Sequence, residues 1–409
     1  MSTQLKTCIT STATYISLLL CSLTIVPPSK SQADVSLSEA VNQQLSPYSA
    51  GNSSGFICGQ LLGTDDANEV LTGGLYLLCT YSGGIPQAST ASTQGPNTGN
   101  INNKTSNVRL TSQAAHTSQQ LTNRWSIFSS FEHTSSKQSV SKLLDAYTAN
   151  QKRFNIGFNY LLSDSTNIGF LVNRRTNEGD YDNRGDFADD GIGAIGFIEF
   201  GLGDDGFLQL SAGREAANTE RNRLAEFSIS GVGPTPSTKG QPKSDFSYSQ
   251  TQLAVQLGSS WILGATQLTP SLTINWQLNN FGTHTEAGDS GLEITTYDDA
   301  QKFLQGLAGV RACWVANFSW GVLAPQLEAN FIREFENKAK EVEVSFTGDK
   351  RAKRFFYNTP AGDNNYLTLS AGGVFILKNG WQVFADIESY SGYANFNQTA
   401  ASLGVRAEF

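Results

Sequence analysis

The chain ends in Leu403-Gly404-Val405-Arg406-Ala407-Glu408-Phe409, with an apolar or small residue at every second position. Successive side chains of a β-strand point to opposite faces of a sheet, so the odd-numbered residues from 401 to 409 would share one apolar face. Such a strand fits two folds. It is either the edge strand of a soluble β-sandwich or the closing strand of an outer-membrane β-barrel, with its apolar face towards lipid.

Twelve strand-like segments follow Arg124, and the connections between them alternate in length. Short turns such as 163–167 and 378–380 alternate with long polar loops such as 176–190 and 338–365. Outer-membrane barrels combine short periplasmic turns with long external loops, whereas a soluble sandwich has no reason to sort its loops in this way. The sequence therefore predicts an all-β fold, a twelve-stranded antiparallel transmembrane β-barrel. The expected strands cover residues 125–133, 153–162, 168–175, 191–202, 207–214, 248–262, 267–279, 303–316, 320–333, 366–377, 381–390 and a closing strand to 409.

Side-chain alternation in the clearest strands agrees with a membrane barrel. In Phe154–Leu162 large apolar side chains alternate mostly with asparagine and glycine, and strand 320–333 alternates in a similar way. Strand 320–333 also carries Glu328, and the expected strand before it, 303–316, carries Arg311. A charge is costly towards lipid and acceptable towards a wet lumen, so we expect both side chains to face the lumen.

The composition supports many short strands and excludes some functions. Of 409 residues only 16% are charged, while glycine (39 residues) and phenylalanine (24 residues) are abundant. A net charge of −8 and a pI near 5.0 argue against a nucleic-acid partner. After the N-terminus no run of about 18 apolar residues occurs, so the sequence offers no transmembrane helix.

Residues 1–33 are expected to be a secretory signal peptide. Lys6 supplies a positive start, Tyr15–Val26 is a largely apolar core, and Ser31-Gln32-Ala33 places small residues before a cleavage site. We expect cleavage before Asp34. An uncleaved anchor is the alternative, but the apolar stretch is short for a membrane span.

The region between the signal and the barrel divides into three parts. Residues 34–82 form a small N-terminal segment, with a helix expected over 36–45 and a strand over 73–81. Residues 83–107 contain few large apolar side chains and are expected to be a flexible linker. Residues 108–123 lack glycine and proline and predict one helix with a polar surface. Sixteen helical residues span about 24 Å, close to the roughly 25 Å apolar height of an outer-membrane barrel, so this helix fits a polar lumen.

Two cysteines of the small segment, Cys58 and Cys79, are candidates for a disulfide, because disulfides persist in exported proteins. The alternative is that both are small buried hydrophobic residues. Cys313 lies in an expected strand and is taken as inert.

Five motifs along the chain occur in the order found in a known family. The most characteristic is Ser319–Asn337 (SWGVLAPQLEANFIREFEN), where a short turn, Trp-Gly, a strand with Pro-Gln and a Glu-Phe-Glu-Asn end follow one another. The others are Arg153–Tyr160 before a Ser-Asp turn, Leu268–Leu272, Asn364–Gly372 and Leu403–Phe409. On these motifs the chain from about residue 125 to residue 409 resembles the autotransporter β-domain, the membrane part of type V secretion proteins.

The resemblance implies an outer-membrane barrel that brings an N-terminal passenger of the same chain to the cell surface. It implies a helix threading the lumen, here residues 108–123. It also implies insertion by the export and barrel-assembly machinery, for which Leu403, Val405 and Phe409 would form the assembly signal. Outer-membrane lipid and these machineries are the expected partners, and the barrel is expected to be monomeric.

The N-terminal segment departs from the family. Autotransporters usually carry a long, repetitive β-helical passenger, whereas residues 34–107 number only 74 and contain no repeat. The leading hypothesis is that the barrel supports translocation or display of its own short segment at the cell surface. A non-secreting pore or structural barrel, and a surface adhesin, are the alternatives.

No residue pattern indicates an enzyme, a cofactor or a small-molecule substrate. Neither a Gly-x-Ser-x-Gly elbow nor a phosphate-binding loop is present in the sequence. None of the histidines has metal-ligand spacing with cysteines or carboxylates. The three histidines are His116, His133 and His284.

Charged clusters in the barrel region are expected to lie in solvent. Carboxylate pairs occur at 189–190, 204–205 and 298–299, where we expect solvated turns rather than calcium sites. The stretch 338–354 is rich in charge and is expected to be a solvated external loop.

Overall fold

The computed structural model describes thirteen ranges of the chain. They are residues 35–45, 85–90, 124–140, 145–182, 184–203, 205–230, 237–264, 266–297, 299–336, 340–349, 352–359, 361–377 and 381–409. The expectations for the signal peptide, for Cys58 and Cys79, and for the lumen helix over 108–123 lie outside these ranges. Among the helices of the described ranges, none is long and apolar enough to cross a membrane.

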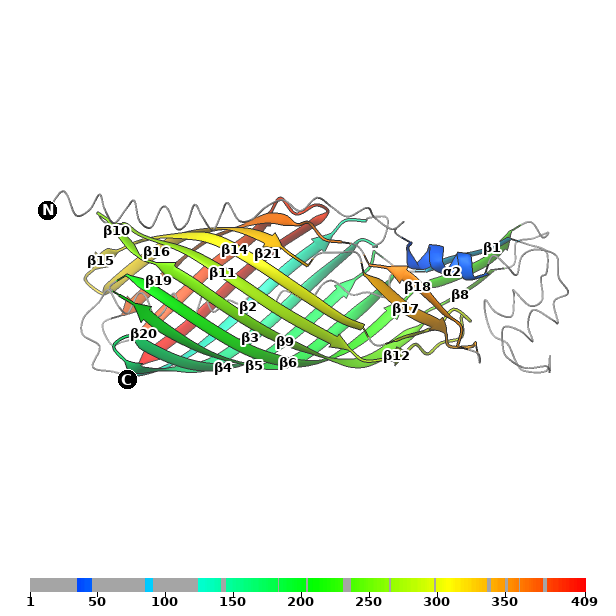
Figure 1. Cartoon of the computed structure of the whole chain (residues 1–409), viewed down its shortest axis with the longest axis horizontal. Coiled ribbons are helices and arrows are strands. Elements are labelled where there is room, and N and C mark those ends of the chain that lie inside the picture. Colours follow the sequence, from blue (N-terminus) through cyan, green and yellow to red (C-terminus); the bar gives the residue numbers. More distant parts are fainter. Residues whose placement is uncertain are drawn as a thin grey trace. The chain divides into compact units, whose positions relative to one another are not determined.

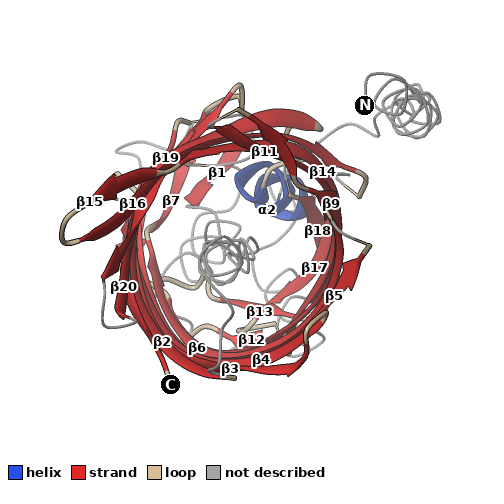
Figure 2. Ribbon diagram, turned by 90° about the vertical axis from the view of Figure 1, so that its left-hand side faces the viewer, coloured by secondary structure: helices blue, strands red, loops and turns tan. Residues whose placement is uncertain are grey.

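Twelve long antiparallel strands form a closed ring, seen from the side in Figure 1 and along its axis in Figure 2. β2 pairs with both β3 and β21, and β9 pairs with both β6 and β11, which closes the ring. The predicted all-β, twelve-stranded antiparallel barrel is therefore confirmed. The long strands are β2 (Trp125–Gln138), β3 (Tyr147–Ser163), β4 (Thr166–Asp180), β5 (Gly185–Leu202), β6 (Gly206–Arg223), β9 (Lys243–Ser259), β11 (Thr266–Phe281), β14 (Asp299–Trp314), β16 (Gly321–Glu334), β19 (Asn365–Leu377), β20 (Trp381–Ser391) and β21 (Phe396–Glu408). Two short strands, β10 (Trp261–Leu263) and β15 (Ala316–Phe318), prolong β9 and β14.

The two ends of the barrel differ in their connections, as the loop lengths predicted. At one end, called the turn end, two or three residues link each successive pair of strands, as at 164–165 and 203–205. Trp125 and Phe409 also meet there, because each backbone N–H donates to the other's carbonyl. The opposite end, called the loop end, carries the long connections. One predicted long loop was wrong, because residues 176–180 and 185–190 continue β4 and β5 as a paired hairpin.

The outer face of the barrel carries an apolar belt. On β5 every outward position from Ile192 to Leu202 is apolar or glycine, and this stretch rises about 25 Å at the usual strand tilt, the height of a membrane belt. The next outward residue is Asp190, which forms an ion pair with Arg174 at 2.8 Å. The belt therefore ends at this level, and the strands above it stand in water.

The closing strand places its odd-numbered side chains on this outer face. Leu403 is 58% exposed, Val405 39% and Phe409 58%, whereas the even-numbered residues from 400 to 406 are buried. The predicted orientation of the strand is confirmed. The role of the three residues in assembly stays a prediction.

Placing a cation in the belt is expected to destabilise the barrel. Val405→Arg should cost about 2–4 kcal/mol, because a guanidinium would leave water for hydrocarbon. Thr399→Arg lies on the same face of β21 but pairs with Ser135, above the belt, and should change the folding free energy little. Equilibrium urea unfolding in lipid vesicles measures both, and equal costs for the two variants would contradict the position of the belt.

Aromatic rings pack over glycines on the lumen side of the wall. A Cβ added at Gly404 would overlap the ring of Phe384, and one added at Gly157 would overlap the ring of Phe128. Because glycine has no side chain, each ring can occupy the space above the neighbouring strand. These ring–glycine contacts pack the lumen side of the wall closely.

Above the loop end lie two small sheets, in which every strand except β1 comes from the long connections. One contains β1 (Ile85–Thr90), β7 (Ala225–Ser230) and β8 (Ser237–Gly240) in that order. The other contains β12 (His284–Thr285), β13 (Ile294–Thr296), β17 (Glu341–Phe346) and β18 (Arg354–Asn358). We call the strands contributed by the barrel loops, β7, β8, β12, β13, β17 and β18, the loop domain.

Two expectations from the sequence differ from this part of the structure. The stretch 338–354 is not a solvated loop throughout, because β17 alternates glutamate with Val342 and Val344, and both valines are buried. Residues 85–90, inside the expected linker, form β1, which pairs along its whole length with β7. In both cases a short segment gains a regular structure only because another segment, distant in sequence, supplies the pairing.

A single described helix, α2 (Leu37–Leu45), lies in the N-terminal segment where a helix was expected. Its first turn is capped, since the backbone N–H of Glu39 donates to Oγ of Ser36 at 3.2 Å. Leu37, Ala40 and Val41 stand three and four residues apart, so they share one face of the helix. This face is buried in the loop domain.

Candidate translocation lumen and docking site

The lumen wall is polar where the outer wall is apolar. The buried inward side chains include Arg153, Asn159, Asn173, Glu199, Gln209, Glu215, Gln252, Gln326 and Arg406. Arg311 and Glu328 also face inward, in register on β14 and β16, and form an ion pair at 2.8 Å. Their predicted orientation is confirmed. Side chains of this kind can form hydrogen bonds with a polar chain in the lumen, but they offer no apolar surface against which an apolar segment could pack.

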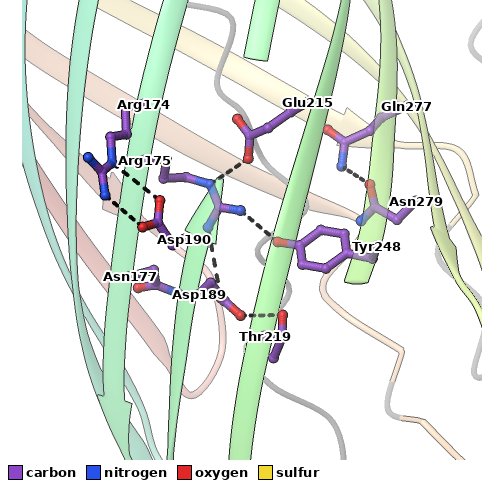
Figure 3. Close-up of polar contacts among 10 residues, drawn as sticks. All are labelled: Arg174, Arg175, Asn177, Asp189, Asp190, Glu215, Thr219, Tyr248, Gln277 and Asn279. Carbon is purple, nitrogen blue, oxygen red and sulfur yellow. Dashed lines mark hydrogen bonds and ion pairs between the residues drawn. The ribbon is translucent and has the colours of Figure 1, made fainter. Parts of the chain in front are cut away.

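One buried cluster of charges joins four strands of the wall (Figure 3). Arg175 on β4 donates from Nε to Oε1 of Glu215 at 2.7 Å and from Nη2 to the hydroxyl of Tyr248 at 2.6 Å. Its Nη1 lies 3.8 Å from Oδ2 of Asp189. The Arg175, Glu215 and Asp189 side chains are at most 2% exposed, so the guanidinium compensates two carboxylates that water does not reach.

The carboxylate of Asp189 is held from two further sides. It accepts a hydrogen bond from Oγ1 of Thr219 at 2.7 Å and one from Nδ2 of Asn177 at 3.1 Å. The neighbouring residues Arg174 and Asp190 form the outward ion pair at the top of the apolar belt. The cluster therefore ties the strands together at the level where lipid stops supporting them.

A second buried ion pair attaches the loop domain to the barrel. Arg223, the last residue of β6, donates from Nε and Nη2 to the two carboxylate oxygens of Glu286, each at 2.6 Å. Its Nη2 also donates to the carbonyl of Leu292. The same carboxylate accepts the backbone N–H of Ile294 at 2.9 Å. One arginine thus fixes the loop that contributes Leu292 and Ile294 to the core of the loop domain.

The core of the loop domain is shared with the N-terminal segment. Its buried residues are Leu37, Ala40 and Val41 of α2 together with Ala225, Phe227, Leu292, Ile294, Val342, Val344, Phe346, Phe355 and Tyr357 of the loops. The backbone is clamped next to α2, since the N–H of Asn358 donates to the carbonyl of Val35 at 2.8 Å and the N–H of Val35 donates to Oδ1 of Asn358 at 3.1 Å. The N-terminal segment is therefore docked on strands that belong to the barrel's loops.

The outer side of the loop domain is charged and wet. Arg354 donates to Glu343 at 2.8 Å, and its guanidinium lies 4.0 Å from the ring centroid of Tyr297. The hydrogen bond to Glu343 raises the pKa of Arg354 further above its already high value. Lys239 and Glu226 form a second exposed pair at 3.0 Å. Exposed pairs add little stability, so the apolar core holds the loop domain together.

Comparisons with known proteins identify the barrel. The family model for the autotransporter β-domain matches residues 127–388. The chain belongs to the autotransporter β-domain family. Its structure is similar to the translocator domain of autotransporter NalP from Neisseria meningitidis, with 15% identity, coverage of 75% of this chain and 95% of that one, and a TM-score of 0.54. It is also similar to the β-domain of the Bordetella autotransporter BrkA, with 16% identity, coverage of 70% and 100%, and a TM-score of 0.51. No relative was found among the curated proteins.

Family membership establishes where this autotransporter resides and its general role. It is an outer-membrane barrel that translocates a passenger, and the passenger is displayed at the cell surface. The turn end is periplasmic and the loop end is external, as in other outer-membrane barrels. The loop domain with its docked helix is consequently on the outside.

Two of the three histidines lie within the described residues. His133 is exposed on the outer face of β2, and His284 stacks on the ring of Phe246 with 3.9 Å between ring centroids. Within the described residues no group of three or more His, Cys, Asp or Glu side chains could hold a metal ion. His116 and the candidate disulfide partners Cys58 and Cys79 lie outside those residues.

The pair Asp189-Asp190 corrects one expectation. It was assigned to a solvated turn, yet both residues lie within β5, where Asp189 is buried in the Arg175 cluster and Asp190 faces outward. The turn assignment was wrong because β5 begins before this pair. Adjacent side chains of a strand point to opposite faces, so one carboxylate is buried and the other is exposed. The positive charge of Arg175 on the preceding strand was the available signal for a buried Asp189, but using it requires knowing that both strands continue above the membrane.

Proposed function

We propose that this autotransporter carries its own residues 34–82 to the cell surface and keeps them attached to the barrel. The observation that supports this is the position of the two described pieces of the N-terminal region. At the external end α2 packs against loop strands and β1 pairs with β7, whereas β2 begins at Trp125 at the periplasmic end. Residues 91–123 must connect the two ends.

The lumen is the proposed route of that connection. A path outside the barrel would take a polar chain through hydrocarbon, where its backbone groups would lack partners. A helix over 108–123 would cover about 24 Å, so it would nearly cross the apolar belt by itself. Arg311, Glu328 and the other inward polar residues would give such a helix a hydrated, hydrogen-bonding surround.

The remaining parts of the proposal concern export and assembly. Residues 1–33 act as the signal peptide, and barrel-assembly machinery recognises the strand that carries Leu403, Val405 and Phe409. Cys58 and Cys79 form a disulfide after export. The role is transport and display rather than catalysis.

An epitope tag between Asp34 and Val35 tests the proposal. Antibody should bind this tag on intact cells, because the segment would be outside. The matched control is the same tag between Asp164 and Ser165, in the turn between β3 and β4, which should become accessible only after the outer membrane is permeabilised. Detection of the N-terminal tag only after permeabilisation would refute translocation of the segment.

A further inference from the structure

We infer that residues 35–45 are a built-in ligand of the loop domain, so that the N-terminal segment is a permanently docked element and not a passenger to be released. The inference rests on the proposed function, since the segment must first reach the surface. Beyond the proposed function, the inference specifies which residues form the binding site. It also specifies the occupant of that site, an amphipathic helix of the same chain.

The binding site is an apolar face on loop strands. Val344 and Val342 on β17 are 0% and 2% exposed, and Phe355 on β18 is 7% exposed. These side chains belong to the core that Leu37, Ala40 and Val41 complete. Removing α2 would expose a contiguous apolar patch on the four-stranded sheet that contains β17 and β18, and such a patch is unfavourable in water.

The helix depends on the site as much as the site depends on the helix. α2 has nine residues, and helices shorter than about 12–15 residues are marginal in water without packing. Its polar side, represented by the exposed Gln43, faces away from the core. Folding of the helix and completion of the loop core are therefore one coupled event.

Two further contacts fix how the segment lies. The reciprocal hydrogen bonds between Val35 and Asn358 set the position at which the chain enters the helix. β1 adds a strand to β7, with register pairs from Ile85–Ser230 to Thr90–Ala225. Strand addition supplies backbone hydrogen bonds, and the helix supplies apolar side chains, which is how extended and helical peptides are usually recognised. The chain is therefore held at α2 in the N-terminal segment and again at β1, which follows that segment.

Cysteine labelling along α2 tests the docking. Gln43→Cys and Val41→Cys are made singly, and intact cells are treated with a membrane-impermeant maleimide, with the wild-type chain as the baseline. The Gln43→Cys variant should label fast, and the Val41→Cys variant at least about tenfold more slowly, because its thiol reacts only during local opening. Ala40→Cys is a second buried position with a small change in volume. Adding Val344→Asp to the Val41→Cys variant should abolish the protection.

The outcomes separate the inference from the proposed function. Equal, fast labelling at positions 40, 41 and 43 on intact cells would leave translocation standing and overturn docking. Labelling of none of them until the membrane is permeabilised would overturn the proposed function and the inference with it. Protection at positions 40 and 41 alone, lost with Val344→Asp, supports both.

Discussion

Arg223→Ala is expected to unfold the loop domain while leaving the barrel closed. The substitution removes the only cation in contact with Glu286 among the described residues, and it leaves this carboxylate buried at 7% exposure. Removing one partner of a buried ion pair costs about 3–5 kcal/mol. The cost falls on the loop domain because Glu286 also holds the N–H of Ile294, a core residue.

Hydrogen exchange measured on the folded protein in detergent reports this effect by region. Amides of β13 and β17 should lose about 3–5 kcal/mol of protection, or all of it, while amides of β20 and β21 stay protected. Lys239→Ala is the matched control, because it removes a cation from an exposed pair of the same domain. Unchanged protection of β13 and β17 in Arg223→Ala would show that the arginine does not anchor the loops.

Arg175→Ala should destabilise the barrel wall itself by a similar amount, about 3–5 kcal/mol. It would leave Glu215 and Asp189 buried and uncompensated, each with at most 2% of its side chain exposed. The adjacent Arg174→Ala is the control, since Arg174 is 65% exposed and its pair with Asp190 lies in water. It should cost far less.

Urea unfolding in lipid vesicles, followed by tryptophan fluorescence, measures both variants. The Arg175→Ala variant should unfold at a clearly lower urea concentration than the Arg174→Ala variant, because only the first leaves buried carboxylates without a cation. Equal unfolding free energies for the two variants would contradict the role given to Arg175.

The membrane part of the fold was predictable because lipid imposes a strict pattern. Side chains of Phe154–Leu162 alternate with period two, and the short turns recur at one end, so strand number and orientation follow from the sequence. The alternation of Arg311 and Glu328 with apolar neighbours likewise placed both charges in the lumen. Each of these inferences uses neighbours within a few residues or a rule that holds for all strands.

The external part was less predictable because water on both faces removes that pattern. Above Ile192 the outward residues of β5 include Asp190 and Asp186, so the strand resembles a loop although its pairing continues. The helix over 36–45 was expected from local propensity, but its binding site was not. That site combines β17 and β18 with a helix some 300 residues earlier, and no local signal joins them.

Severing the chain between the docked segment and the barrel is the most direct measurement of the central claim. A recognition site for a specific protease is inserted between Thr98 and Gly99, and the variant is purified in its folded state. The protease then cuts the chain, and any released fragment is separated from the barrel under native conditions. The fragment that contains α2 and β1 should stay with the barrel in the wild type and in Gln43→Asp, and it should leave in Val41→Asp. Release of the wild-type fragment would contradict a noncovalently docked N-terminal segment.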